Sequence, residues 1–281
     1  MGRADTKQEG ERMIATDRLK DALATALDRY AEMMGEPFKT EPKLETVPDE
    51  AVWAVVQPDG TGCTITATEG IATALRDLWS EALDQQALLR DRDTRPANDP
   101  DELTAVSLSW LMHHEMEHFG LGHLGLVGAR GFTETNHPNA RALIARSSAP
   151  LATATDLGFD TEDMSAISRC LELQADHDAI GMITGPYSNE GWPELRSRVA
   201  SIFAVMILID REDRKRGEVG HTHPRAATRI FQLLGHMAIF WSVPAQKIAW
   251  EAGRTKIDPA DLPPEAEIEA FKTEVVHPAF R

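Results

Sequence analysis

Apolar residues recur every three or four positions through most of the chain, the spacing that places them on one face of an α-helix. In the first such stretch the apolar positions stop at Gly35, a residue typical of a helix C-terminus. We therefore expect a helix over residues 13–35, preceded by a mobile tail over residues 1–12. Further helices are expected at residues 71–90, 108–120, 192–211, 224–241 and 245–252. The helix that carries Glu172 is expected to begin at residues 160–163, which combine a capping residue with an acidic first turn.

One stretch favours β-structure instead. Two runs rich in β-branched and aromatic residues, 51–56 and 63–67, flank a Pro-Asp-Gly sequence at residues 58–60. This combination predicts a β-hairpin over residues 51–68. The expected fold class is therefore mainly α with a small β-hairpin or sheet (α+β).

Neither a repeat nor a clear linker divides the chain, so residues 1–281 are expected to form one domain. Residues 36–50 and 253–281, rich in Pro and charged residues, are expected to run over the surface. The long connection at 125–160 contains at most a short helix at 139–146. It is either a loop that covers a cleft or a plain surface insertion.

The helix expected at residues 108–120 carries His114 and His118, with Glu115 between them, in an HExxH pattern. Residues four apart lie on one helix face, so both imidazoles can reach the same metal ion. Glu115 points to the side of that metal, where it can take a proton from a water that the metal activates. Zinc suits the site, because neutral imidazole binds it well and hydrolysis needs a Lewis acid without redox behaviour.

Catalytic zinc usually has three protein ligands, so a third ligand is expected among the residues after this helix. His123 falls one position early for the HExxHxxGxxH pattern and is a poor third ligand. Glu172 is the better one, because it lies four positions from Asp176 on one face of a predicted helix. The small Ala175 and Ala179 would let another helix approach closely. Glu172 would bind the metal, and Asp176 would orient a zinc-binding histidine; the alternative is two solvated carboxylates on an acidic surface.

A later segment, residues 222–230, reads THPRAATRI. Pro224 suits the first turn of a helix, which places His223 at the start of that helix and Arg229 in its second turn. In an acidic protein, Arg229 can also simply pair with a carboxylate such as Asp176 or Glu172.

Together the three motifs resemble those of gluzincin peptidases of the HtpX heat-shock protease and CAAX prenyl protease type. That group shows HExxH, often followed by a Gly-His pair as at 122–123, then an ExxAD sequence as at 172–176 and a THPxxxxR segment as at 222–229. The resemblance extends over about residues 51–235.

The resemblance implies a zincin-like metallopeptidase fold with a catalytic helical core at residues 103–240 and one zinc ion per chain. It also implies that the edge of the strand pair forms part of the substrate cleft, where an extended peptide can bind. The alternative is an ordinary two-stranded hairpin that packs on helices. His223, or else Arg229, would stabilise the negative charge that develops on the substrate carbonyl oxygen.

Charge and composition limit the classes of molecule that the protein can bind. A net charge of −16 argues against nucleic acid and against anionic membrane surfaces. The longest uncharged apolar stretch, 199–209, is too short to span a bilayer, and the N-terminus has no apolar signal region. The chain is therefore expected to be soluble, unlike the best-known members of the family, which sit in membranes. Its two cysteines are few, as in a reducing compartment, so a cytoplasmic location is expected.

The sequence thus predicts a zinc-dependent endopeptidase in which His114, His118 and Glu172 bind the metal and Glu115 is the general base. A peptide or protein would be the substrate. One alternative is a binding or regulatory protein in which zinc only fastens helices together, with a side chain such as His123 as a fourth ligand. Another is a host-defence protease of narrow specificity. Oligomeric state and physiological trigger stay open.

Overall fold

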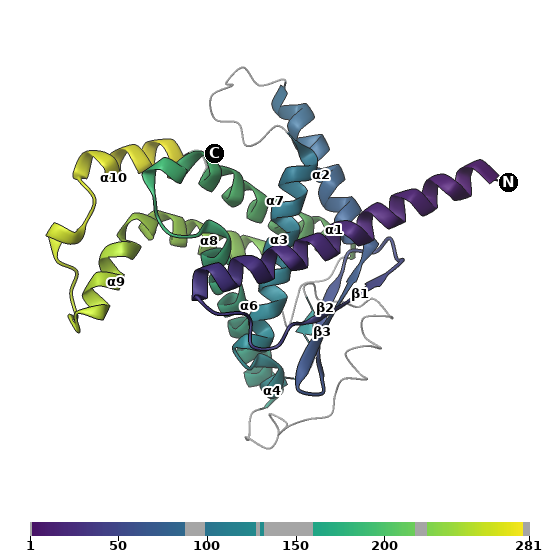
Figure 1. Cartoon of the computed structure of the whole chain (residues 1–281), viewed down its shortest axis with the longest axis horizontal. Helices are drawn as coiled ribbons and strands as arrows, with labels where there is room; N and C mark the ends of the chain where they lie inside the picture. The colour runs from purple at the N-terminus through teal and green to yellow at the C-terminus, as the bar shows by residue number, and fades with distance from the viewer. Residues whose placement is uncertain (1, 88–98, 128–129, 132–159, 217–223, 278–281) are drawn as a thin grey trace.

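The computed structural model describes residues 2–87, 99–127, 130–131, 160–216 and 224–277 (Figure 1). It is mainly helical with one small sheet, as the sequence predicts. The long helices are α1 (Gly2–Met34), α2 (Glu69–Ala87), α3 (Pro100–Gly120), α6 (Thr161–Thr184), α7 (Trp192–Arg216) and α8 (Ala226–Ile239). The shorter ones are α4 (His123–Val127), α9 (Val243–Glu251) and α10 (Glu265–Phe271). In Figure 1, α3 runs through the centre, with the sheet on one side of it and α9 and α10 on the other.

Helix α3 is the centre of the core. It packs against α1, α2, α6 and α7, and against strand β2 (Ala54–Asp59). Its start is set by Pro100 in the first turn and by Asp99, whose side chain accepts a hydrogen bond from the backbone N–H of Asp101. From Ser107 to His118 every residue is buried, so the polar side chains of this stretch lie inside the protein.

The sheet has the strand order β1-β3-β2-β4. Strand β2 and strand β3 (Gly62–Thr68) form an antiparallel pair within the predicted hairpin, which is thereby confirmed. The connection between them includes Gly60, whose φ of 60° favours glycine. Ala54 and Val56 of β2 face the main core, while Trp53 and Val55 form a small buried cluster of their own, so both faces of this strand are covered.

Two further strands lie where the sequence did not indicate any. Strand β1 (Lys43–Val47) pairs in parallel with β3, inside the segment expected to run over the surface. Its side chains are exposed or half-buried, so the amino-acid composition of this edge strand resembles that of a surface loop. Strand β4 (Arg130–Gly131) pairs with Val55 and Val56 on the other side of β2.

Helix boundaries differ from the expected ones at two places. Helix α1 begins at Gly2, so the segment expected to be a mobile tail is helical from there; it lacks the apolar positions by which buried helices are recognised. Helix α8 begins at Ala226 and not at Pro224, because Arg225 has an extended ψ of 147° and is the N-cap residue. By contrast, α6 begins where its acidic residues predict, with reciprocal capping contacts between Asp160 and Asp163.

The C-terminal segment, expected to wrap the surface, inserts apolar side chains into the core, among them Phe271, Val275 and Val276. Phe271 at the end of α10 is completely buried, with ring centroids 5.6 Å from those of Tyr187 and Trp192. The helix expected at 139–146, and most of the connection at 125–160, fall outside the described residues. Within the described part of the chain, no helix is both long and apolar enough to cross a membrane.

Candidate metal centre

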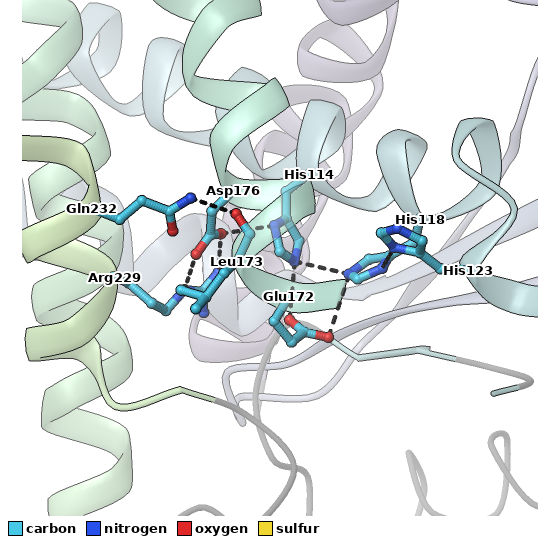
Figure 2. Close-up of polar contacts among 8 residues, drawn as sticks. All are labelled: His114, His118, His123, Glu172, Leu173, Asp176, Arg229 and Gln232. Atoms are coloured by element: carbon cyan, nitrogen blue, oxygen red, sulfur yellow. Dashed lines mark hydrogen bonds and ion pairs between the residues drawn. The ribbon is translucent and has the colours of Figure 1, made fainter. Parts of the chain in front are cut away.

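Two histidine side chains from the C-terminal part of α3 meet inside the core. His114 and His118 lie one turn apart, and their Nε2 atoms are 3.2 Å from each other (Figure 2). Both side chains are completely buried. Trp110, one turn earlier, has its ring centroid 5.5 Å from that of His114, so an aromatic ring packs beside this histidine.

Helix α6 brings a carboxylate to both histidines. The two carboxylate oxygens of Glu172 lie 3.4 Å from Nε2 of His114 and 3.4 Å from Nε2 of His118. Ala175 and Ala179, on the same helix, are completely buried, which is consistent with the close packing of α6 on α3. The ligand atoms of the three residues all lie within 4.8 Å of one another, so this buried group could hold a metal ion.

Asp176 lies behind His114. Its Oδ1 atom is 3.0 Å from Nδ1 of His114, the nitrogen on the side away from Glu172. Arg229 from α8 forms a two-pronged contact with the same carboxylate, with Nε 2.7 Å from Oδ2 and Nη2 2.5 Å from Oδ1. The guanidinium carbon also lies 5.8 Å from the ring centroid of Trp110. A chain of contacts thus runs from Arg229 on α8 through Asp176 on α6 to His114 on α3.

The charges of this group depend on one another. Burial alone lowers the pKa of His114, but the contacts with Asp176 and Glu172 outweigh it and raise the pKa to about 9. Burial likewise raises the pKa of Asp176, but Arg229 and His114 outweigh it and hold the pKa below its usual value. Because a metal ion binds neutral imidazole, metal binding here would displace a proton from His114.

His118 has a partner on its far nitrogen as well. Its Nδ1 atom lies 2.9 Å from Nδ1 of His123, which is itself buried at the start of α4. Nε2 of His123 lies 3.2 Å from Oε1 of Gln174. His123 therefore contacts His118 on the side opposite to Glu172 (Figure 2).

Glu115 is completely buried beside the histidines. Among the described residues, neither of its carboxylate oxygens has a hydrogen-bonding partner. Burial raises the pKa of Glu115 to about 8; the charge of His114 acts against this rise and that of Glu172 adds to it. A divalent cation at the three ligands would favour the ionised form. A buried carboxyl group without partners costs free energy, so it calls for a functional explanation.

The two other predicted site residues have different outcomes. His223 lies outside the described residues. Arg229 directs Nε and Nη2 at Asp176, as the ion-pair alternative predicts.

Sequence reasoning missed three supporting side chains. Trp110 lies four positions before His114, and this helical spacing could have identified it. Gln232 lies three positions after Arg229 and donates a hydrogen bond of 2.6 Å to the backbone oxygen of Leu173. Gln174 had no comparable signal, because its contact with His123 depends on how α4 meets α6.

Comparison of the chain with models of protein families, with curated proteins and with solved structures finds no match.

Proposed function

We propose that the chain is a zinc-dependent endopeptidase of the gluzincin type, with His114, His118 and Glu172 as metal ligands. The observation that carries the proposal is Glu115, a buried carboxylate with no hydrogen-bonding partner among the described residues, next to a group that could hold a metal. A metal that only fastens helices together gives such a carboxylate no role. A hydrolase needs it as a general base.

Zinc is the proposed metal because the ligand spacing suits it. The two Nε2 atoms are 3.2 Å apart, and each lies 3.4 Å from one of the two carboxylate oxygens of Glu172. In a tetrahedral site with bonds of about 2.0–2.1 Å, neighbouring ligand atoms are roughly 3.3 Å apart. At the same bond length an octahedral ion would place them at about 2.9 Å. Two imidazoles with one carboxylate are also better ligands for zinc than for magnesium or calcium.

The protein groups would divide the work as follows. Zinc supplies Lewis acidity that makes a water molecule acidic near neutral pH and polarises the scissile carbonyl. Glu115 takes the proton of the attacking water and passes it to the leaving amine. Asp176, held by Arg229, keeps His114 in its orientation. Because two nitrogens of Arg229 contact Asp176, His223 is the first candidate for stabilising the carbonyl oxygen.

The substrate is proposed to be a peptide or protein that binds in extended form along the sheet edge next to α3, as in the resembled family. Strands β2 and β4 both contact α3, and β4, which pairs with Val55 and Val56 of β2, is the edge strand on that side of the sheet. Main-chain hydrogen bonds from a strand edge hold an extended peptide largely independently of its sequence.

The decisive variant is Glu115→Gln, which keeps the shape of the side chain and removes the base. We expect full zinc content and an unchanged fold, with peptide cleavage lower by on the order of 10²-fold or more. Cleavage is measured on a mixture of denatured proteins, by mass spectrometry of the newly formed N-termini. Glu117→Gln is the matched control, because Glu117 is a buried glutamate on the same helix and contributes no ligand atom to the metal group. Equal cleavage by the wild type and Glu115→Gln would refute the proposal.

One observation favours a second candidate, a zinc-stabilised binding protein: all three ligand side chains are completely buried. Under that alternative, chelation of the metal should unfold the helical core, and Glu115→Gln should change neither stability nor any activity. The position of His123 argues against it, because a structural site is usually closed by a fourth protein ligand. His123 contacts Nδ1 of His118 instead.

A further inference from the structure

A chain of polar contacts links His118 to the protein surface. Its Nδ1 atom lies 2.9 Å from Nδ1 of His123, and Nε2 of His123 lies 3.2 Å from Oε1 of Gln174 (Figure 2). His123 is only 2% exposed, whereas Gln174 is an exposed residue of α6. The proposed peptidase mechanism assigns no role to His123 or Gln174.

The positions of the protons along this chain follow from its outer end. The amide oxygen of Gln174 can only accept a hydrogen bond, so Nε2 of His123 carries the proton. In the neutral form of His123 the other nitrogen, Nδ1, is an acceptor, and Nδ1 of His118 then donates to it. The lone pair of His118 is then left on Nε2, the atom that lies 3.4 Å from Glu172.

We infer that His123 and Gln174 are positioning residues for the metal ligand His118. They hold its ring in place and keep it in the tautomer whose Nε2 can bind a metal ion. Asp176 plays the same orienting role for His114, because its Oδ1 atom lies 3.0 Å from Nδ1 of His114. Each proposed metal-binding histidine thus has a partner on its Nδ1 atom.

Local backbone structure explains how a residue so close in sequence reaches this position. After α3 the chain turns back at Gly122, which has a φ of 76° and donates a backbone hydrogen bond of 3.0 Å to the carbonyl oxygen of Phe119. A residue with a side chain rarely adopts this conformation. The turn places His123 at the start of α4, directly against the ring of His118.

Two variants of His123 separate orientation from packing. His123→Asn keeps a side-chain acceptor but loses the volume of the ring. His123→Phe keeps the ring but removes the acceptor that Nδ1 of His118 contacts. Gln174→Met removes the outer acceptor at an exposed position, where the fold tolerates substitution.

The test measures the zinc dissociation constant of the full chain by competition with a chromophoric chelator at constant pH. We expect His123→Phe and Gln174→Met to weaken zinc binding by roughly 10–100-fold, the usual effect of losing a partner of a ligand. His123→Asn should retain more affinity than His123→Phe. Thermal melting of the zinc-free proteins shows that each variant is folded. If His123→Phe does not fold, Gln174→Met alone decides.

A packing role predicts the reverse order of the two His123 variants, and that order would overturn the inference. Wild-type affinity in Gln174→Met would overturn it too. The inference rests on the zinc centre of the proposed function but not on peptide cleavage. Wild-type protein that binds no zinc would overturn both. Zinc binding that responds as expected in a protein that cleaves no peptide supports the inference and refutes only the proposed peptidase.

Discussion

Replacing Arg229 with Met should cost about 3 kcal/mol of folding free energy. The change removes the guanidinium that makes two contacts with Asp176, both side chains being completely buried. Breaking a buried ion pair by removing one partner costs roughly 3–5 kcal/mol, because the other charge stays buried without compensation. His114 contacts the same carboxylate and supplies part of the missing positive charge, which places the expected value at the lower end. Met preserves most of the aliphatic volume, so the loss reports on charge and hydrogen bonds.

A second arginine provides the matched control. Arg211 on α7 makes a similar two-pronged contact with Glu81 on α2, at 2.9 and 3.4 Å. Its side chain and that of Glu81 are 46% and 47% exposed, so water already solvates both charges. Pairs of this kind contribute about 0–1 kcal/mol, and Arg211→Met should cost no more than that.

The assay is equilibrium unfolding in urea, with a chelator present so that metal binding does not contribute to the measured stability. A double variant tests whether the uncompensated charge of Asp176 causes the loss of stability. Asp176→Asn combined with Arg229→Met leaves no charge at the pair, so it should cost less than Arg229→Met alone. The reasoning is refuted if Arg229→Met loses no more stability than Arg211→Met, or if the double variant is less stable than both single ones.

Purified protein should carry about one zinc ion per chain by elemental analysis, and the His114→Ala/His118→Ala double variant should carry none; full occupancy in that variant would show that the ligands are assigned wrongly. His223→Ala should lower kcat by on the order of 10²–10³-fold in steady-state kinetics, with KM and zinc content nearly unchanged, and a variant that keeps full turnover or loses its zinc would contradict the oxyanion role. Gly122→Ala should destabilise the protein by about 1–2 kcal/mol through its positive φ alone, because an added Cβ meets no atom within 4 Å. Gly125→Ala is the control, because its added Cβ also meets no atom within 4 Å and Gly125 has no positive φ. Thermal unfolding should show Gly122→Ala to be less stable than Gly125→Ala by at least this cost of about 1–2 kcal/mol.

Features that depend on neighbours along the chain could be predicted from the sequence. Helical spacing alone places His114 and His118 on one face, and the structure keeps their Nε2 atoms 3.2 Å apart. The Pro-Asp-Gly sequence lies within the hairpin, and Asp160 caps the helix that carries Glu172. In each case the interacting groups lie within a few residues of one another, so the local pattern contains the information.

Elements without an apolar pattern could not be predicted, because their local sequence does not contain this information. The first turns of α1 and the edge strand β1 consist mostly of polar residues, and periodicity identifies an element only by the face that it buries. Strand β1 forms because the edge of β3 offers it hydrogen bonds, which its own composition does not reveal.

The tertiary structure alone decided which side chains meet. From the sequence, Arg229 was as able to pair with a carboxylate as to stabilise an oxyanion, and the packing of α8 on α6 directs it to Asp176. His123 looked like a misplaced ligand until the turn at Gly122 brought it to the far nitrogen of His118. Such contacts depend on how whole helix surfaces and turns fit together, and residue spacing along one helix carries no information about the angle and distance at which another helix approaches.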